Sequence, residues 1–177
     1  GSNVLELGCG DGKTLAGMPD GWLSYALDFS LPALRLSRSL STAARLILAD
    51  ACRLPFLDSV FDAVFAFHVT GHLLLPGRRA LAAEAARVLV PGGRLFFREF
   101  AAGDIRDGKG EQVEAGTFLR RNGIATHFFR EWEAEELFCD LRPVSVEECR
   151  WSMRIRGTDL MRCEVQAVFE ASLDLRS

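Results

Sequence analysis

Residues 4–14 read VLELGCGDGKT and combine a carboxylate with three glycines at alternate positions. An apolar run that passes into such a loop is typical of a buried strand that turns sharply into a helix beside a bound ligand. Glycine at every second position lets the backbone approach a flat, small ligand, because no side chain intervenes. Glu6 precedes the turn and can present its carboxylate to a cationic group. The segment therefore predicts a site for a small ligand.

Two other kinds of glycine loop fail at single positions. A triphosphate-binding loop requires G-x-x-x-x-G-K-[ST], and residues 12–14 (GKT) supply its end, but Leu7 stands where the leading glycine is needed. A dinucleotide-binding loop requires G-x-G-x-x-G, and Lys13 occupies the position of its third glycine, where its side chain would hinder close packing of helix on strand. The sequence therefore excludes a nucleotide triphosphatase and argues against a dinucleotide site.

Two further carboxylates follow the next predicted strands. Asp28 ends the strand predicted at residues 23–28, where a carboxylate can accept hydrogen bonds from both hydroxyls of a ribose. Asp50 follows the strand predicted at residues 45–49, where it can accept from an exocyclic amine. The carboxyl ends of consecutive parallel strands line one crevice. Together with Glu6, these acids predict a site for a nucleoside that has a positively charged tail and no phosphates.

The elements that must position these residues alternate over the first 100 residues. Strands are predicted at residues 3–8, 23–28, 45–49, 61–68 and 94–100. Helices are predicted at residues 12–18, 30–40 and 77–89, with Ser30 as the N-cap of the second helix and PGG at 91–93 ending the third. This alternation predicts a parallel sheet with helices on both faces.

The pattern changes after residue 100. Residues 101–116 are polar and rich in glycine, which indicates a loop or flap, and residues 117–130 place RNG between two apolar runs, which indicates a hairpin. Residues 131–141 predict an acidic amphipathic helix, and residues 144–155 and 161–171 predict a closing antiparallel hairpin. We therefore predict an α/β fold, a Rossmann-like three-layer sandwich whose seven-stranded sheet is mostly parallel with an antiparallel C-terminal hairpin.

Composition limits the size and class of the protein. The chain has 177 residues, of which 49% are hydrophobic, which suffices for one domain and is too short for two. We expect residues 1–177 to form this domain, with residues 101–130 as a cap on the substrate side. The net charge of −3 argues mildly against an autonomous nucleic-acid binder. No apolar run approaches the roughly 18 residues that a membrane span needs.

The ends and the cysteines add two expectations. The chain begins Gly-Ser and lacks an initiator Met, so we expect it to be trimmed, processed or the ordered part of a longer polypeptide. Five cysteines are scattered, and no pair has the close spacing of a zinc site or a redox dithiol, so we expect no metal. Reduced thiols suit a cytoplasmic protein.

Four segments, in this order, resemble the class I S-adenosylmethionine-dependent methyltransferases, in their type 11-like form. The segments are VLELGCGDG at 4–12, ALDFS at 26–30, ADACRLPFLDSVFDAVFAFHV at 49–69 and RVLVPGGRLFF at 87–97. The resemblance covers residues 3–100. It implies S-adenosyl-L-methionine as the cofactor and S-adenosyl-L-homocysteine as the product.

The resemblance also implies which residues contact the cofactor. It implies Glu6, Gly8, Cys9 and Gly10 around the methionine moiety, Asp28 on the ribose, Phe29 against adenine, Asp50 and Ala51 at the adenine edge, and Phe67 or His68 along the floor. Taken singly, each feature is better explained as a turn glycine or a solvated acid. The ordered set favours the cofactor.

Beyond residue 100, the chain resembles the tRNA methyltransferases that make 3-methylcytidine. That group ends its fifth strand with Arg-Asp-Tyr, matched here by Arg98, Glu99 and Phe100. Its later Tyr-Val-Arg-x-Asp-Gly-Thr-Arg run, which ends in Phe-Phe, is matched by Phe118, Leu119, Arg120, Asn122, Gly123, Phe128 and Phe129. Glu99 is longer than the usual Asp, Phe100 lacks the Tyr hydroxyl, and Ala125 replaces an Arg. The resemblance implies tRNA processing by methylation of cytidine N3 in tRNA or another RNA.

The expected chemistry asks little of the side chains. A sulfonium already carries an activated methyl group, and a ring nitrogen with a free lone pair needs no general base. The protein must align nucleophile, methyl and sulfur and exclude water. A hydroxyl or carbon acid would need a base, for which His68 and His72 are the candidates, although such histidines are more often packing residues. Arg98 is the third catalytic candidate. Like Arg120 and Arg121, it can contact phosphate or stack on a base, or else lie ion-paired at the surface.

Three functions stay open. The arginines of the cap favour an RNA acceptor, and a partner protein could then supply further RNA binding. The acidic balance favours a small-molecule acceptor instead. The third function is that of a non-catalytic, cofactor-binding partner subunit, against which the complete set of Glu6, Asp28 and Asp50 argues. We expect no membrane association.

Overall fold

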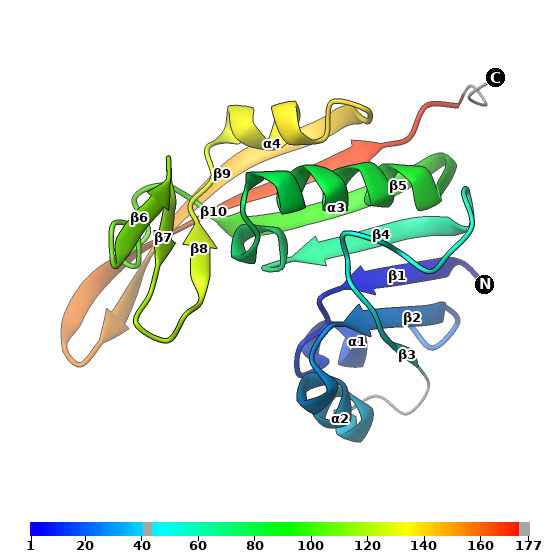
Figure 1. The fold of residues 1–177 in the computed structure, drawn as a ribbon, viewed down its shortest axis with the longest axis horizontal. Helices are drawn as coiled ribbons and strands as arrows, with labels where there is room; N and C mark the ends of the chain where they lie inside the picture. Colours follow the sequence, from blue (N-terminus) through cyan, green and yellow to red (C-terminus); the bar gives the residue numbers. More distant parts are fainter. Residues whose placement is uncertain (41–43, 174–177) are drawn as a thin grey trace.

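The computed structural model describes residues 1–40 and 44–173, and its centre is a seven-stranded sheet (Figure 1). In spatial order the strands are β3 (Arg45–Leu48), β2 (Leu23–Asp28), β1 (Asn3–Leu7), β4 (Phe61–Phe67), β5 (Leu89–Phe100), β10 (Thr158–Glu170) and β9 (Arg142–Ile155). Strands β1 to β5 pair in parallel, whereas β10 pairs antiparallel with both β5 and β9. The predicted fold class is confirmed.

Helices and a smaller sheet complete the described part of the chain. The helices are α1 (Lys13–Ala16), α2 (Leu31–Leu40), α3 (Leu75–Val88) and α4 (Glu131–Leu137), with a 3-10 turn η1 at Thr70–His72. Strands β6 (Glu111–Glu114), β7 (Thr117–Leu119) and β8 (Ala125–His127) form an antiparallel sheet. Ser30 caps α2 as predicted, because its hydroxyl accepts a hydrogen bond from the Ala33 amide at 3.4 Å. None of the described helices is long and apolar enough to cross a membrane.

The segment around PGG differs from the prediction. Strand β5 begins at Leu89, directly after α3, because Leu89 pairs with Phe61 of β4. The next pair in this ladder joins Arg94 to Ala63, so the predicted stop between helix and strand is an irregularity inside the strand. A bulge of this kind tolerates proline, which has no amide hydrogen to give to a ladder.

The smaller sheet combines a confirmed prediction with a missed one. The hairpin predicted at residues 117–130 is present as β7 and β8, which pair antiparallel. Strand β6 lies within residues 101–116, which we predicted to be a loop or flap. We did not predict a strand there, because EQVE is polar on both faces and shows no alternation. It forms because β7 supplies its hydrogen-bonding partner, with Glu111 opposite Leu119.

Two apolar clusters hold the layers together, one on each face of the sheet. On one face, α3 and α4 cover the sheet, and Phe97 of β5 lies 5.2 Å from both Phe129 and Phe138 (Figure 1). On the other face, Leu15 of α1 and Leu34 of α2 pack around Ala26. The side chains of successive strand residues point to opposite faces, so β2 contributes to both clusters.

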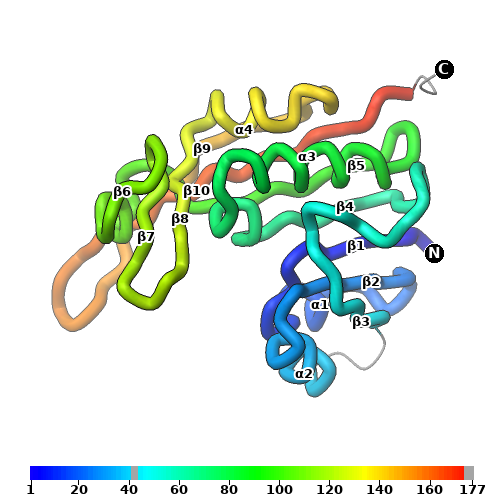
Figure 2. The backbone as a smooth tube through the Cα atoms, viewed as in Figure 1, coloured from blue at the N-terminus to red at the C-terminus, as the bar shows by residue number. Residues whose placement is uncertain are grey.

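The smaller sheet lies beyond the carboxyl ends of the parallel strands, beside the distal part of the β9–β10 hairpin (Figure 2). Backbone hydrogen bonds attach it to the end of β5: the Phe129 amide donates to the Phe100 carbonyl at 2.8 Å, and the Ala102 amide donates to the Phe129 carbonyl at 3.0 Å. The segment expected to cap the substrate side therefore lies at the edge where the predicted site residues gather.

Candidate cofactor and acceptor site

The glycine turn has left-handed backbone angles at all three alternate positions. The φ angles of Gly8, Gly10 and Gly12 are 66°, 52° and 85°, a region that other residues rarely adopt. A Cβ atom at Gly8 would lie 2.5 Å from Val69, and one at Gly12 would lie 2.5 Å from Ser37. A Cβ atom at Gly10 would meet nothing within 4 Å. The protein's own packing thus requires two of the glycines, while Gly10 faces open space that a ligand can occupy.

Asp28 holds this turn against the end of β2. Its Oδ2 accepts a hydrogen bond from the Gly10 amide at 2.9 Å, and its Oδ1 accepts one from the Ser30 amide at 2.8 Å. Each carboxylate oxygen can accept a second hydrogen bond, so Asp28 keeps acceptor capacity for a pair of ribose hydroxyls. The side chain lies at the end of β2, as predicted, and its contact with a ribose stays a prediction.

One carboxylate oxygen of Glu6 accepts no hydrogen bond from the described part of the chain. The side chain is buried, and its Oε2 has no hydrogen-bond partner among the described residues. Burial raises the pKa of Glu6 to about 7, the hydrogen bond with Thr14 opposes this, and the charges of Asp11 and Asp28 add to it. A cationic group of a ligand would stabilise the ionised carboxylate and relieve the cost of burying it. The residue therefore fits the charged tail of the predicted cofactor.

The side chain of Cys9 points into the protein interior and is not available to a ligand. Its amide donates to the Leu27 carbonyl at 3.0 Å, and its side chain packs in the apolar cluster with Leu15 and Leu34. Burial raises the pKa of the thiol to about 11, so it stays protonated. Any contact of Cys9 with the cofactor would be through its backbone.

The residues predicted to hold adenine form an open rim. The Phe29 side chain is 85% exposed directly after β2, which leaves its ring available to a flat base. Strand β3 ends at Leu48, so Asp50 lies two residues beyond the strand, a small correction to its predicted end at residue 49. The exposed Asp50 accepts a hydrogen bond from the Cys52 amide at 2.8 Å, and Ala51 packs partly against the core. The Ala49 amide donates to the Asp28 carbonyl, which joins this rim to the glycine turn.

His68 lies at the end of β4 in an unusual backbone conformation. Its φ is 55°, its Nδ1 is buried with no hydrogen-bond partner among the described residues, and its Nε2 lies 3.6 Å from Oε1 of Glu164. Burial and then the charge of Arg98 lower the pKa of His68 to about 4. The imidazole is therefore neutral at physiological pH and is a weak base.

Glu99 supports the turn that carries His68. Its side chain is buried, its Oε1 accepts a hydrogen bond from the Gly71 amide at 2.9 Å, and its Oε2 lies 3.9 Å from Nδ1 of His68. Burial raises the pKa of Glu99 to about 8, so the carboxyl is largely protonated at neutral pH. The sequence signal for this role is an acid inside the apolar strand LFFREF, which we interpreted only as a family match.

The other two catalytic candidates lie apart from each other. Arg98 stacks over the ring of Phe67, with its guanidinium carbon 4.6 Å from the ring centre, on the same sheet face as Glu6. Phe67 and Arg98 also line a hollow of about 460 Å³ next to α1. His72 is exposed, and its Nδ1 donates to the Ala125 carbonyl at 2.9 Å, so it joins η1 to β8.

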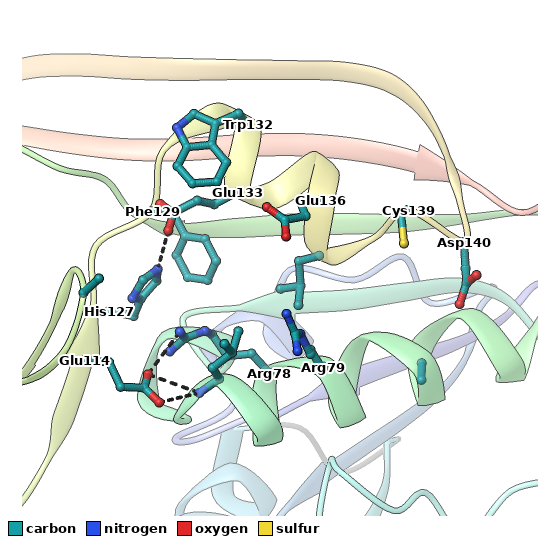
Figure 3. Close-up of a pocket in the computed structure, with 14 residues that line it drawn as sticks. Arg78, Arg79, Glu114, His127, Phe129, Trp132, Glu133, Glu136, Cys139 and Asp140 are labelled. Atoms are coloured by element: carbon teal, nitrogen blue, oxygen red, sulfur yellow. Dashed lines mark hydrogen bonds and ion pairs between the residues drawn. The ribbon is translucent and has the colours of Figure 1, made fainter.

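A larger groove lies between α3 and α4, away from these residues (Figure 3). It has a volume of about 600 Å³, and none of the predicted site residues lines it. Two close contacts between polar side chains lie in it: Nη2 of Arg78 is 3.2 Å from Oε2 of Glu114, and Nε2 of His127 is 3.4 Å from Oε1 of Glu133. The groove is therefore separate from the predicted cofactor site.

Known proteins resemble this chain in sequence as well as in fold. The family described as "Methyltransferase domain" matches residues 5–97, which is more than half of the chain. The chain belongs to this family. The matched range includes the glycine turn, Asp28, Asp50 and β4.

Two curated relatives and one solved structure extend the comparison. The domain is 28% identical over 151 residues to the tRNA N(3)-cytidine methyltransferase METTL2 of Gallus gallus, covering 76% of this chain and 41% of the relative. It is 28% identical over 156 residues to the 27-O-demethylrifamycin SV methyltransferase of Amycolatopsis mediterranei, covering 84% of this chain and 57% of the relative. A SAM-dependent methyltransferase structure from Methanosarcina mazei superimposes with a TM-score of 0.76 at 23% identity, covering 98% of this chain and 93% of that one.

The matches cover only part of the two relatives, and they confirm the family but not the role of any single residue. The methyltransferase domain spans less than two thirds of the length of the two curated relatives. The recognition of the S-adenosylmethionine-dependent methyltransferases, and with it the class of cofactor, is confirmed. The roles assigned to individual site residues stay predictions.

Proposed function

We propose that this domain transfers a methyl group from S-adenosyl-L-methionine to a ring nitrogen of a nucleobase, cytidine N3, in tRNA or another RNA. The observation that carries the cofactor half of the proposal is the turn in which Asp28 binds the Gly10 amide while Glu6 keeps an unsatisfied buried oxygen. Similarity to a tRNA cytidine methyltransferase over 76% of this chain supports the acceptor.

The residues present fit the cofactor at three points. Asp28 would accept from the ribose hydroxyls, Glu6 would face the cationic part of the methionine moiety, and Phe29 would lie against adenine. The open space at Gly10 would let the backbone approach the ligand closely. When bound, the cofactor supplies a methyl group that is already activated.

The acceptor side of the site favours a nucleophile with its own free lone pair. His68 is the candidate base at the end of β4, and a pKa of about 4 makes it a poor proton acceptor at neutral pH. A hydroxyl acceptor would need a stronger base at this position, whereas a ring nitrogen needs none. The protein's task is then to orient the acceptor and exclude water. Residues 101–130 would do this as a cap within a single domain of a cytoplasmic enzyme.

A small-molecule acceptor is the second candidate. The net charge of −3 and the similarity to a rifamycin methyltransferase over 84% of this chain favour it. A non-catalytic subunit that binds the cofactor is the third, and the retained carboxylates at Glu6 and Asp28 count against it. An RNA acceptor would also leave room for a partner protein that adds RNA binding.

Two measurements on the wild-type chain separate these functions. Calorimetric titration with S-adenosyl-L-homocysteine should give heat and a thermal shift, and the absence of both would leave a scaffold role ahead of a methyltransferase. Transfer of tritiated methyl groups should then label total tRNA or rRNA rather than a metabolite extract. Gel shifts against tRNA over a salt series check the acceptor class, because phosphate contacts make RNA binding salt-sensitive. Binding of cofactor with label only in the metabolite extract would establish the second candidate.

A further inference from the structure

A row of stacked rings and guanidinium groups continues from the glycine turn into the cap. Val69 packs so closely against Gly8 that a Cβ atom there would lie 2.5 Å away. The next ring is His68, and the ring of Phe100 lies 4.5 Å from it. The guanidinium carbon of Arg106 lies 4.3 Å from the centre of the Phe100 ring. Arg106 is thus linked to the glycine turn through Phe100, His68 and Val69.

A second arginine of this row, Arg162, forms an ion pair. The guanidinium carbon of Arg162 lies 5.3 Å from the Phe100 ring, and its Nε donates to Oδ2 of Asp104 at 2.7 Å. Both side chains are buried. Asp104 also accepts from the backbone amides of Arg106 and Cys163, at 3.0 and 3.1 Å. The carboxylate of Asp104 is therefore committed to Arg162 and to the local backbone.

Arg106 has no such partner. Within residues 1–40 and 44–173, its guanidinium forms no ion pair, although its side chain is only partly exposed. Burial first, and then the charge of Arg162, lower the pKa of Arg106, and Asp104 and Glu164 oppose this. A half-buried cation without a compensating anion is unfavourable until an anion binds beside it.

The charges around Arg106 leave a positive excess. The cations that act on this region are Arg98, Arg106, Arg120 and Arg162, and the acids are Asp104, Glu164 and Glu99. Glu99 is largely protonated at neutral pH, because burial raises its pKa to about 8, and His68 is neutral. The four arginines thus outnumber the acids of this region, in a chain whose net charge is −3. This local excess is what an anionic ligand would need.

We propose that Arg106, supported on the ring of Phe100, binds a phosphate of the acceptor RNA next to the nucleoside that is methylated. A guanidinium matches the geometry of phosphate oxygens, and stacking on an aromatic ring fixes its plane before the ligand arrives. Arg162 stays with Asp104 and keeps the row in place. Arg106 is in this sense a positioning residue for the acceptor. The inference rests on the proposed RNA acceptor and names one of its contacts.

The test measures binding of a fluorescently labelled tRNA by anisotropy over a salt series. Arg106→Gln should weaken binding roughly tenfold, as expected for a charge-assisted hydrogen bond, and reduce the salt slope by about 1. Arg106→Lys should keep the slope and lose part of the affinity. The matched control is Arg79→Gln, which removes an exposed arginine of α3 and should change neither quantity. In methyl-transfer assays, Arg106→Gln should raise KM with little change in kcat.

The design separates this inference from the proposed methyl transfer. Titration with S-adenosyl-L-homocysteine should give the same affinity for wild type and all three variants, which also shows that each is folded. Equal RNA affinity and salt slope for wild type and Arg106→Gln would overturn the phosphate contact and leave the methyl transfer standing. Wild-type protein that binds cofactor but no RNA would overturn the contact too. Added inorganic phosphate should compete with the tRNA in wild type and less in Arg106→Gln.

Discussion

The carboxylate of Asp28 accepts a hydrogen bond from the Gly10 amide at 2.9 Å, so the same side chain that is placed to hold a ribose also shapes the glycine turn. The parallel register that pairs Leu7 with Leu27 brings the two strand ends side by side. The turn and the acid are therefore one unit, and neither can change without affecting the other.

Replacing Asp28 should reduce both stability and cofactor affinity. Asp28→Ala leaves the amides of Gly10 and Ser30 without their acceptor, and we expect the free energy of unfolding to fall by about 1–3 kcal/mol. Asp28→Asn retains one acceptor oxygen, so it should lose less stability. Its affinity for S-adenosyl-L-homocysteine should still fall by roughly 10- to 100-fold, because a charge-assisted contact is lost. Urea unfolding and calorimetry measure the two effects, with Asp20→Ala as an exposed control. Unchanged cofactor affinity in Asp28→Asn would contradict the ribose assignment.

Two glycines of the turn should respond differently to alanine. Gly8→Ala places a Cβ atom 2.5 Å from Val69 at a positive φ, so the free energy of unfolding should fall by roughly 2–4 kcal/mol. Gly10→Ala meets no neighbouring atom and should cost only the backbone strain, roughly 1–2 kcal/mol. Its methyl group would occupy the open space at the turn. The free energy of cofactor binding should therefore fall by more than the free energy of unfolding. If Gly10→Ala bound the cofactor as well as wild type, the ligand could not pass close to this residue.

Glu99 should make the free energy of unfolding fall as the pH rises toward 8. Burial raises its pKa to about 8 in the folded state, above its usual value of 4.5, so its contribution is fully present below pH 4.5 and is lost as pH rises through 8. Glu99→Gln stays neutral and should lose at least about 1 kcal/mol less stability than wild type between pH 5.5 and 8.5. Glu6, whose pKa is about 7, titrates in both proteins and cancels in this difference. Parallel pH curves for the two proteins in urea unfolding would show that Glu99 is ionised in the fold. Glu111→Gln, at an exposed position, serves as the control.

The sequence predicts the parallel half of the molecule well because each strand there is a mostly apolar run bounded by turn residues. Strand β2 has the predicted bounds, and its acid lies at the predicted place beside the glycine turn. Such features are local: an apolar run, a glycine and an acid occur within a few residues of one another.

The rest of the site depends on contacts between distant segments, which no local pattern reveals. Asp104 and Arg162 are 58 positions apart, and their pairing decides which arginine of the row is left unpaired. Polar β6 forms only because β7 lies beside it. The burial of Glu99 under Gly71 likewise follows from the way η1 folds back over β5.

His68 provides the sharpest test of the acceptor chemistry. Its φ of 55° suits asparagine, which enters the left-handed region more readily than most residues, so His68→Asn should fold with little loss of stability. With a pKa of about 4, the wild-type imidazole is neutral throughout pH 6–9, and its removal should leave the pH profile of methyl transfer unchanged over that range.

The size of the effect distinguishes a packing role from a catalytic one. Loss of the ring that packs against Phe100 should lower kcat/KM by less than about tenfold, whereas removal of a general base typically costs 10²–10⁴-fold. The measurement is methyl transfer to the labelled acceptor at several pH values, with His72→Asn as the matched control on η1. A loss above about 100-fold, together with a changed pH profile in His68→Asn, would show that the acceptor gives up a proton to His68. The acceptor would then be a hydroxyl or carbon acid rather than a ring nitrogen.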